Sequence, residues 1–342
     1  MELLLHNQSY LLYLIGVMMV SGMIRDQQLF AGLYTLLLRR IKSKRLLMAL
    51  VALLCGVLPI PGRVTFSAGM LDTLVARKAP CRSKIGLIDY LSTHHYYLWS
   101  PLEKTVIIPM AVLGLSYGQF LVYSLPLLVV SLCFIAGYLF VYVKERDIDL
   151  QLAETAPVQA AALWMNTIPL LLAVAAMIYG FHPAMVFPGL VIYYHVRSNN
   201  RDHRHLLTYV NLRLVLFLAL VIIAGNVIAQ HDEAIKSILS TYQLQMDQPD
   251  GVMIISLFAF GSGYVLGSSS KFAGLVALLS SLYGLEYLTF FLALEFSGYL
   301  LSPVHKCVWI GKMYFGTPLS HYFYTLSTWC VLIVAYGVVA SF

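Results

Sequence analysis

A short proline-containing segment occurs twice in this 342-residue chain, and it carries groups that can bind a ligand. Residues 98–114 read LWSPLEKTVIIPMAVLG and residues 300–316 read LLSPVHKCVWIGKMYFG, with seven of seventeen positions identical. Proline removes a backbone donor and clashes with the preceding turn, so each segment predicts a helix break, with an ordinary proline kink as the alternative. Half-helix ends offer dipoles and free backbone groups to a ligand. The candidate binding residues here are Ser100, Pro101, Ser302, Pro303 and His305.

Two basic residues, Arg63 and Lys271, each lie at the predicted turn of a long apolar region. A charge at the bilayer centre costs at least about 2.5–3.5 kcal/mol, so it normally faces a cavity or a partner. With the amides of nearby glycines and helix N-termini, the two side chains would form a positive site for an anion. Alternatively, both snorkel or pair with internal acids. The candidate residues at these two turns are Pro61, Gly62, Arg63, Thr65, Gly267, Ser268, Ser269, Ser270 and Lys271.

Acids and histidines within the apolar segments are candidates for binding a coupling proton or cation. Burial raises the pKa of a carboxyl group, as proton coupling near neutral pH requires. A Na⁺ site would instead use backbone carbonyls and the hydroxyls at the breaks and turns. The sequence leaves both possibilities open, and core packing or helix capping is the alternative role for each histidine. The coupling candidates are Asp72, Glu103, His94 and Glu295, with Asp89, Glu286 and His95 as further buried candidates.

The sequence indicates no metal centre. Its five cysteines (55, 81, 133, 307 and 330) are scattered without CxxC spacing, which favours neither a disulfide framework nor a metal site. The adjacent histidines of THHYY (93–97) would point about 100° apart on a helix, which argues against a shared ion. No cofactor is expected apart from Na⁺ as a coupling ion.

The composition is that of a membrane protein. Hydrophobic residues make up 60% of the chain and charged residues 11%, and the mean hydropathy is +0.79. A soluble domain would be about one quarter charged. The net charge of +6 fits basic cytoplasmic loops better than an acidic partner, and no nucleic-acid partner is expected.

The elements that position the candidate residues follow from the lengths of the apolar segments. A spanning helix needs roughly 20 residues. Regions 45–80 and 252–283 are each cut by turn-forming residues into arms of about 14 residues, or roughly 21 Å, too short to cross about 30 Å of hydrocarbon. We therefore predict two re-entrant hairpins there. Proline-broken helices are predicted at 84–118 and 285–318, and spanning helices at 8–24, 119–143, 159–179, 182–196 and 207–230.

Charge placement predicts the orientation of these elements. Basic residues concentrate at 25–45, 77–84, 144–146 and 197–205, whereas the 231–251 loop is acidic. By the positive-inside rule, the basic segments are cytoplasmic and both chain termini lie outside. Tracing the chain on this basis makes the two hairpins open to opposite faces. GRVTFSAGM (62–70) also aligns with GSSSKFAGL (267–275), at nearly the same offset as the two proline segments.

The fold class that follows is an all-α polytopic membrane protein built from two inverted repeats, residues 1–150 and 151–342. Each repeat would contain a re-entrant helical hairpin and a proline-broken helix. Repeats of inverted topology with discontinuous helices are typical of secondary transporters.

The pattern resembles the ion transporter superfamily, which includes divalent-anion/sodium symporters, and within it an uncharacterised integral-membrane family. The residues that carry the resemblance are LPIPGRVTFSAGMLD (58–72), the region ending in Pro101, GSSSKFAG (267–274) and GYLLSPVHKC (298–307). The resemblance implies hairpin tips and broken helices around a midplane site. It also implies a homodimeric scaffold that moves its solute by an elevator-like mechanism.

The function expected from these features is secondary active transport of a small anionic solute, coupled to Na⁺ or H⁺, in a bacterial inner membrane with periplasmic termini. A membrane-embedded enzyme is an alternative, although no HExxH, GxSxG or DxxxD pattern supports it. A non-transporting membrane partner or scaffold is another alternative. Polar, charged hairpin tips argue against a scaffold, and the protein is not expected to be an enzyme.

Overall fold

A computed structural model describes residues 2–26, 37, 40–57, 64, 67–68, 71–72, 82–148, 160–197, 203–242 and 244–342. Over these residues the chain is helical and contains no strand, as the apolar composition predicted. Four of the predicted binding residues, Pro61, Gly62, Arg63 and Thr65, lie outside the described residues, together with half of the first predicted hairpin.

The helices form in apolar segments bounded by turn-forming residues. In the first half they are α1 (Glu2–Asp26), α3 (Lys44–Val57), α5 (Arg82–His94), η1 (His95–Leu98), α6 (Lys104–Leu113), α7 (Tyr117–Gly137), η2 (Tyr138–Tyr142) and η3 (Glu145–Asp147). In the second half they are α8 (Ala160–Ile178), α9 (Pro183–Arg197), α10 (His203–Leu207), α11 (Leu212–Gln230), α12 (Asp232–Thr241), α13 (Pro249–Leu266), α14 (Ser269–Tyr283), η4 (Leu285–Tyr287), α15 (Leu288–Leu301), α16 (Lys306–Phe315) and α17 (Leu319–Ser341).

Three of the described helical segments are long and apolar enough to cross a membrane: Tyr117–Tyr142, Pro249–Leu266 and Leu319–Ser341. A fourth span results if Leu285–Leu301 and Lys306–Phe315, which are bent by 42° at a short break, count as one. Large apolar side chains on the outer sides of α7, α13 and α17 are exposed, which suits contact with lipid. The chain is therefore a membrane protein.

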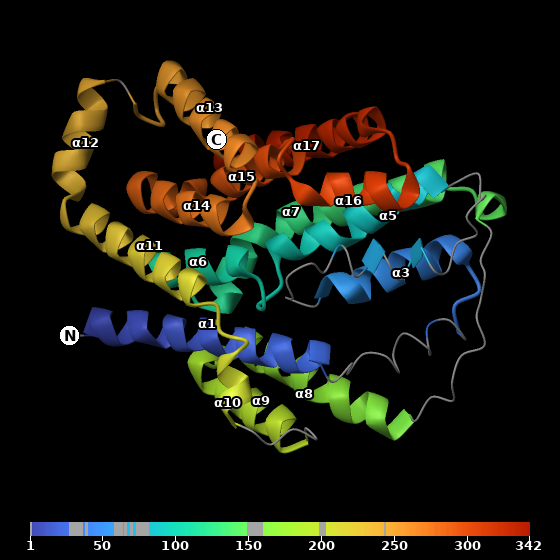
Figure 1. Cartoon of the computed structure of the whole chain (residues 1–342). Coiled ribbons are helices and arrows are strands. Elements are labelled where there is room, and N and C mark those ends of the chain that lie inside the picture. Colours follow the sequence, from blue (N-terminus) through green and yellow to red (C-terminus); the bar gives the residue numbers. More distant parts are fainter. Residues whose placement is uncertain are drawn as a thin grey trace.

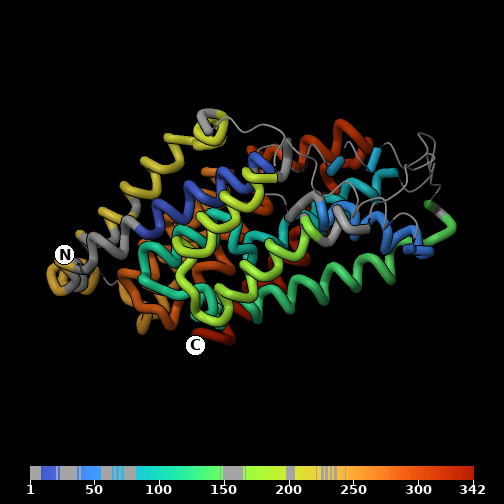
Figure 2. Tube along the Cα trace, turned by 90° about the horizontal axis from the view of Figure 1, so that it is seen from below, coloured from blue at the N-terminus to red at the C-terminus, as the bar shows by residue number. Residues whose placement is uncertain are grey.

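The helices that carry the candidate residues pack at the centre of the molecule (Figure 1). α15 lies between α13 and α17, α14 packs on α6, and α16 packs on α5. Helices from before and after residue 150 thus interleave in one core. Both views place α9 beside α1 on one side of this core, and α8 packs on α9 (Figure 2).

Two helices, α13 and α14, lie where the second hairpin was predicted, with a turn at Gly267–Ser268; because α13 is long enough to cross a membrane, the re-entrant character of the pair stays a prediction. Gly267 has φ +52°, a left-handed conformation that glycine adopts without steric cost. The predicted first arm was too short, because the helix begins at Pro249, three residues before 252. Proline is favoured at the first helical position, and the resulting 18 residues span about 27 Å.

Basic residues from two segments contact residues 142–148 at one end of the molecule. Arg45 forms an ion pair with Glu145 at 3.3 Å, and Lys44 Nζ donates to the Ile148 carbonyl at 2.7 Å. Lys84 Nζ donates to the Tyr142 carbonyl at 2.9 Å. This end lies to the right in Figure 1, and the start of α13 lies to the left.

The two ends should therefore be accessible from opposite sides of the membrane. We expect an impermeant maleimide to label Asp250→Cys in intact cells, and to label Lys144→Cys only after permeabilisation. Both positions are exposed. The unsubstituted protein, treated in the same way, corrects for its native cysteines. Labelling of both variants in intact cells would contradict the orientation derived from the basic residues.

Candidate functional site

Two helices are interrupted at the positions that the repeated Ser–Pro segments predicted. The first runs through α5 and η1, breaks at residues 99–103 and resumes as α6. The second is α15, which ends at Leu301 and resumes as α16 at Lys306. The two helix breaks are confirmed, whereas the predicted role of Ser100, Pro101, Ser302 and Pro303 in binding stays a prediction.

The two breaks have the same local backbone structure. The Glu103 amide donates to the Ser100 carbonyl at 2.9 Å, and the His305 amide donates to the Ser302 carbonyl at 3.1 Å. Each following helix has ten residues and ends at a left-handed glycine, with φ +67° at Gly114 and +66° at Gly316. The sequence repeat is therefore also a repeat of local conformation.

The two breaks contact each other in the protein interior. The hydroxyl groups of Tyr97 and Tyr299, which directly precede the matched Leu98 and Leu300, are 3.0 Å apart. Tyr97 and Tyr299 are separated by 202 residues, the same spacing as the two Ser–Pro motifs. Residues at equivalent positions of the two segments therefore contact each other where the two breaks meet. The segments matched in the sequence begin one residue after this pair.

Side-chain donors form hydrogen bonds with the backbone carbonyls that lack a helical partner at the breaks. At the first break, Tyr13 donates to the Pro101 carbonyl and Tyr117 donates to the Trp99 carbonyl at 2.6 Å. At the second, Tyr90 donates to the Leu300 carbonyl at 3.1 Å, and Trp309 donates to the Pro303 carbonyl at 2.9 Å. A buried carbonyl without a partner costs free energy, so aromatic donors stabilise both breaks.

The turn of the second hairpin lies against the second break. A Cβ at Gly267 would come within 3.0 Å of Ser302 Oγ and 2.5 Å of a Val304 methyl group, so only glycine fits there. Ser302 is fully buried, and its hydroxyl has no hydrogen-bond partner among the described residues. The structure thus brings together Gly267 and Ser302, two predicted binding residues from different elements.

Three helix N-termini start around these contacts. α6, α14 and α16 begin after Glu103, Ser268 and His305, and none of these three residues forms a side-chain cap. Phe272 of α14 packs on Tyr97 and Tyr299, which holds the start of α14 beside the two breaks. Such N-termini carry partial positive charge and free amide groups.

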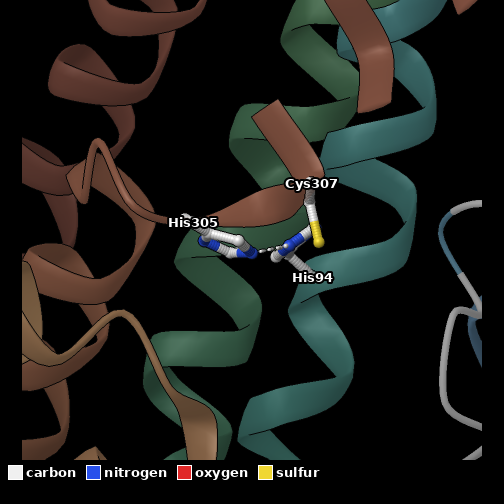
Figure 3. A group of neighbouring side chains, drawn as sticks. All are labelled: His94, His305 and Cys307. Carbon is white, nitrogen blue, oxygen red and sulfur yellow. Dashed lines mark hydrogen bonds between the residues drawn. The ribbon is translucent and has the colours of Figure 1, made fainter. Parts of the chain in front are cut away.

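A pair of buried histidines joins the two interrupted helices (Figure 3). Nε2 of His94, at the end of α5, lies 3.2 Å from Nε2 of His305, which precedes α16. Cys307 lies beside them, and the nearest ligand atoms of the three residues are all within 4.8 Å of one another. The sequence analysis named both histidines but missed Cys307, although the spacing His305-x-Cys307 within the repeated segment was a usable signal.

His95 does not share this site. Its Nδ1 accepts a hydrogen bond from Trp99 Nε1 at 3.0 Å, so it belongs to the packing of the first break.

The predicted acids have different surroundings. Glu295 is fully buried; its Oε1 accepts from Ser262 at 2.6 Å, and its Oε2 has no hydrogen-bond partner among the described residues. Glu103 is buried at the first break. Asp72 forms an ion pair with Arg82, which argues for a structural role. The expectation that Glu286 is buried was wrong, because it lies in an exposed turn before α15.

Asp89 on α5 is buried and accepts a hydrogen bond from Ser67, a residue of the first predicted hairpin. The second basic candidate, Lys271, is exposed in the first turn of α14 and forms no ion pair with the described residues. Pro303 is also exposed, whereas Ser100, Pro101, Ser269 and His305 are buried. The structure thus gathers the serines and histidines at the breaks but leaves the Lys271 side chain outside.

The fold and these contacts define a class: an integral membrane protein whose two interrupted helices meet at their breaks. A family model described as "Protein of unknown function (DUF401)" matches residues 6–341. Because this match covers almost the entire chain, the chain belongs to that family. No curated protein matches it. The family description states no activity, so the resemblance to ion transporters stays a prediction.

The contact between the breaks can be measured with a double-mutant cycle. Tyr97→Phe and Tyr299→Phe each remove one side of the same hydrogen bond, so we expect the double variant to be about as stable as either single variant. The coupling free energy should be roughly 0.5–1.5 kcal/mol, measured by thermal unfolding in detergent. Tyr193→Phe is the control, since its hydroxyl bonds to the distant Met165 carbonyl and should act additively. Full additivity of Tyr97→Phe and Tyr299→Phe would rule out their contact.

Proposed function

We propose that this protein is a secondary active transporter that binds a small anionic solute where the two interrupted helices meet. The observation that carries the proposal is the contact between the two breaks, made by Tyr97 with Tyr299 and by His94 with His305. Interrupted helices are costly in a membrane and are tolerated where they surround a cavity or a binding site. In transporters, discontinuous helices of two repeats form such a site near the bilayer midplane.

Inverted repeats are part of the proposal. The order interrupted helix, left-handed glycine and long apolar helix occurs once as α5–α6–α7 and again as α15–α16–α17. In Figure 1, α3 approaches the centre from the right, whereas α13 and α14 lie to the left. These features support two inverted halves, at 1–150 and 151–342, that meet at one site.

The preference for an anion rests on the three uncapped helix N-termini, α6, α14 and α16. Their partial positive charge and amide donors suit a carboxylate or an oxyanion. The buried hydroxyl of Ser302 adds a further donor. Arg63 keeps its proposed role as a bidentate anion ligand, whereas the exposed Lys271 would act at longer range.

The proposal also includes coupling to Na⁺ or H⁺, an elevator-like movement of a homodimer, and a bacterial inner membrane with both termini in the periplasm. Among the acids predicted for coupling, Glu295 suits the role best. It is fully buried, and one carboxylate oxygen has no hydrogen-bond partner among the described residues. Such a group is costly unless a proton or a cation accompanies it.

An anion screen tests the function. Purified protein in detergent is heated with phosphate, sulfate, succinate or citrate, in Na⁺ or choline buffer, at several pH values. We expect at least one anion to raise the melting temperature, because a ligand stabilises the folded state by RT ln(1 + [L]/Kd). That anion should then accumulate in proteoliposomes under a Na⁺ or proton gradient. Stabilisation by neutral or cationic solutes alone would overturn the anion assignment.

Ser302→Ala should weaken binding of the anion found in that screen by about 5–10-fold, because one hydrogen bond contributes about 1–1.5 kcal/mol. Ser131→Ala is the matched control, since this buried hydroxyl donates within its own helix to Leu127 at 2.7 Å. Isothermal titration gives both affinities. Equal affinities in the two variants would remove Ser302 from the site.

Glu295→Gln should retain anion binding but lose the dependence of uptake on the driving gradient. The amide keeps the size of the side chain and removes its ability to bind a proton or a cation. Ser262→Ala, which removes only the hydroxyl that bonds Glu295, should have a smaller effect. Uptake in proteoliposomes with and without each gradient gives the comparison. Gradient-driven uptake by Glu295→Gln at the native rate would assign coupling to another residue.

A further inference from the structure

The residues of the histidine pair come from sequence-distant parts of the chain and converge at the joined breaks. His94 ends α5, His305 precedes α16, and Cys307 is the second residue of α16. Both histidines are buried and Cys307 is half-buried. Imidazole and thiolate groups are the preferred ligands of zinc-like ions.

Hydrogen bonds fix the tautomer of His94. Its Nδ1 lies 2.6 Å from the Tyr90 carbonyl, and because a carbonyl only accepts, Nδ1 must carry the proton. The ring also stacks on Tyr90, at 3.8 Å between centroids and 7° between planes, which holds its orientation. In the neutral ring, Nε2 is therefore an acceptor.

The same reasoning applies to His305. Its Nδ1 lies 3.1 Å from the Tyr299 carbonyl and 3.2 Å from the Tyr90 hydroxyl. The Tyr90 hydroxyl can itself donate to the Leu300 carbonyl at 3.1 Å, which leaves its oxygen to accept from His305. Nδ1 of His305 is then the donor, and Nε2 again carries a lone pair.

Two acceptor atoms thus face each other at 3.2 Å in a buried site. Two neutral imidazoles that both carry the proton on Nδ1 repel in this arrangement, and a positive charge between them makes it favourable. That charge is either a proton shared by the two rings or a metal ion bound by both. The thiol of Cys307 beside the pair distinguishes the two, because a soft sulfur ligand strengthens a metal site.

We propose that His94, His305 and Cys307 bind a transition-metal ion of the zinc class. With Zn–N bonds of about 2.0–2.1 Å, two ligands of a tetrahedral site are about 3.3 Å apart. The Nε2–Nε2 distance of 3.2 Å matches this edge. With a Zn–S bond of about 2.3 Å, each nitrogen–sulfur edge is about 3.6 Å, which the thiolate reaches from within 4.8 Å by a small side-chain adjustment.

The groups that hydrogen-bond to the two histidines also fit a metal site. In metal sites, the second nitrogen of a histidine ligand usually donates to a carbonyl or a carboxylate, which fixes the ring orientation. Here the Tyr90 and Tyr299 carbonyls accept from the two Nδ1 atoms. Three protein ligands leave one tetrahedral position for water or a solute. Nitrogen and sulfur ligands disfavour Mg²⁺ and Ca²⁺, which prefer oxygen.

A metal ion here would link the two interrupted helices, since His94 and His305 are 211 residues apart. It would stabilise the contact between the breaks independently of any transported solute. The inference therefore does not rest on the proposed transport function, and its test requires no substrate.

The test uses the full chain in detergent, stripped of metal with a chelator. Titration with Co²⁺, a spectroscopic substitute for Zn²⁺, should give tetrahedral visible bands and a thiolate charge-transfer band at one equivalent, and Zn²⁺ should abolish both. Zn²⁺ should also raise the melting temperature. Cys307→Ser should remove the charge-transfer band. Its Zn²⁺ affinity should fall at least about 10–100-fold, because mutating a residue that only hydrogen-bonds to a metal ligand already causes a loss of this size.

His94→Ala and His305→Ala should lower the Zn²⁺ affinity at least as much. The controls are Cys133→Ser and His321→Ala, at exposed positions outside the cluster, which should leave affinity and spectrum unchanged. If a histidine variant does not fold, X-ray absorption of the native Zn²⁺ protein should still report two nitrogen ligands and one sulfur. No binding at micromolar Zn²⁺ would overturn the proposal. Unchanged binding in Cys307→Ser, or an absorption spectrum without sulfur, would likewise overturn the proposal.

Discussion

The need to satisfy backbone carbonyl groups at two helix breaks constrains the rest of this structure. In hydrocarbon, a released carbonyl has no water to bind and must find a donor within the protein. Tyrosine, tryptophan and threonine side chains supply these donors: Tyr117 bonds Trp99, Thr105 bonds Tyr97, and Trp309 bonds Pro303. The breaks are therefore held by side chains from α1, α6, α7 and α16, and their positions fix how these helices pack.

The two breaks have the same backbone conformation but carry different side chains. With the repeat spacing of 202 residues, Glu103 is equivalent to His305 and Thr105 to Cys307. Both segments thus build the same turn and the same left-handed glycine, while their polar side chains differ. At the equivalent position, the first break carries the buried Glu103, and the second carries His305, which contacts His94 of the first interrupted helix and lies beside Cys307.

Polar groups of this kind are expensive to bury in a membrane protein. Glu295 lies on α15, Ser302 and His305 lie in the break that follows it, and His94 of α5 contacts His305, while the outer surfaces of α7, α13 and α17 expose large apolar side chains. Membrane proteins tolerate such polar groups where they serve binding or coupling. Both the proposed solute site and the proposed metal site use these polar groups.

The sequence by itself determined the features that depend on local chemistry. The lengths of the apolar segments predicted most helices to within a few residues, and the Ser–Pro motifs predicted both breaks, because proline disrupts a helix whatever surrounds it. The first arm of the second hairpin was misjudged, because Pro249 can begin a helix as well as end one. Which distant residues meet depends on how the helices pack, and no local pattern encodes it. Only the tertiary structure paired Tyr97 with Tyr299, placed His94 and Cys307 beside His305, and left the Lys271 side chain exposed.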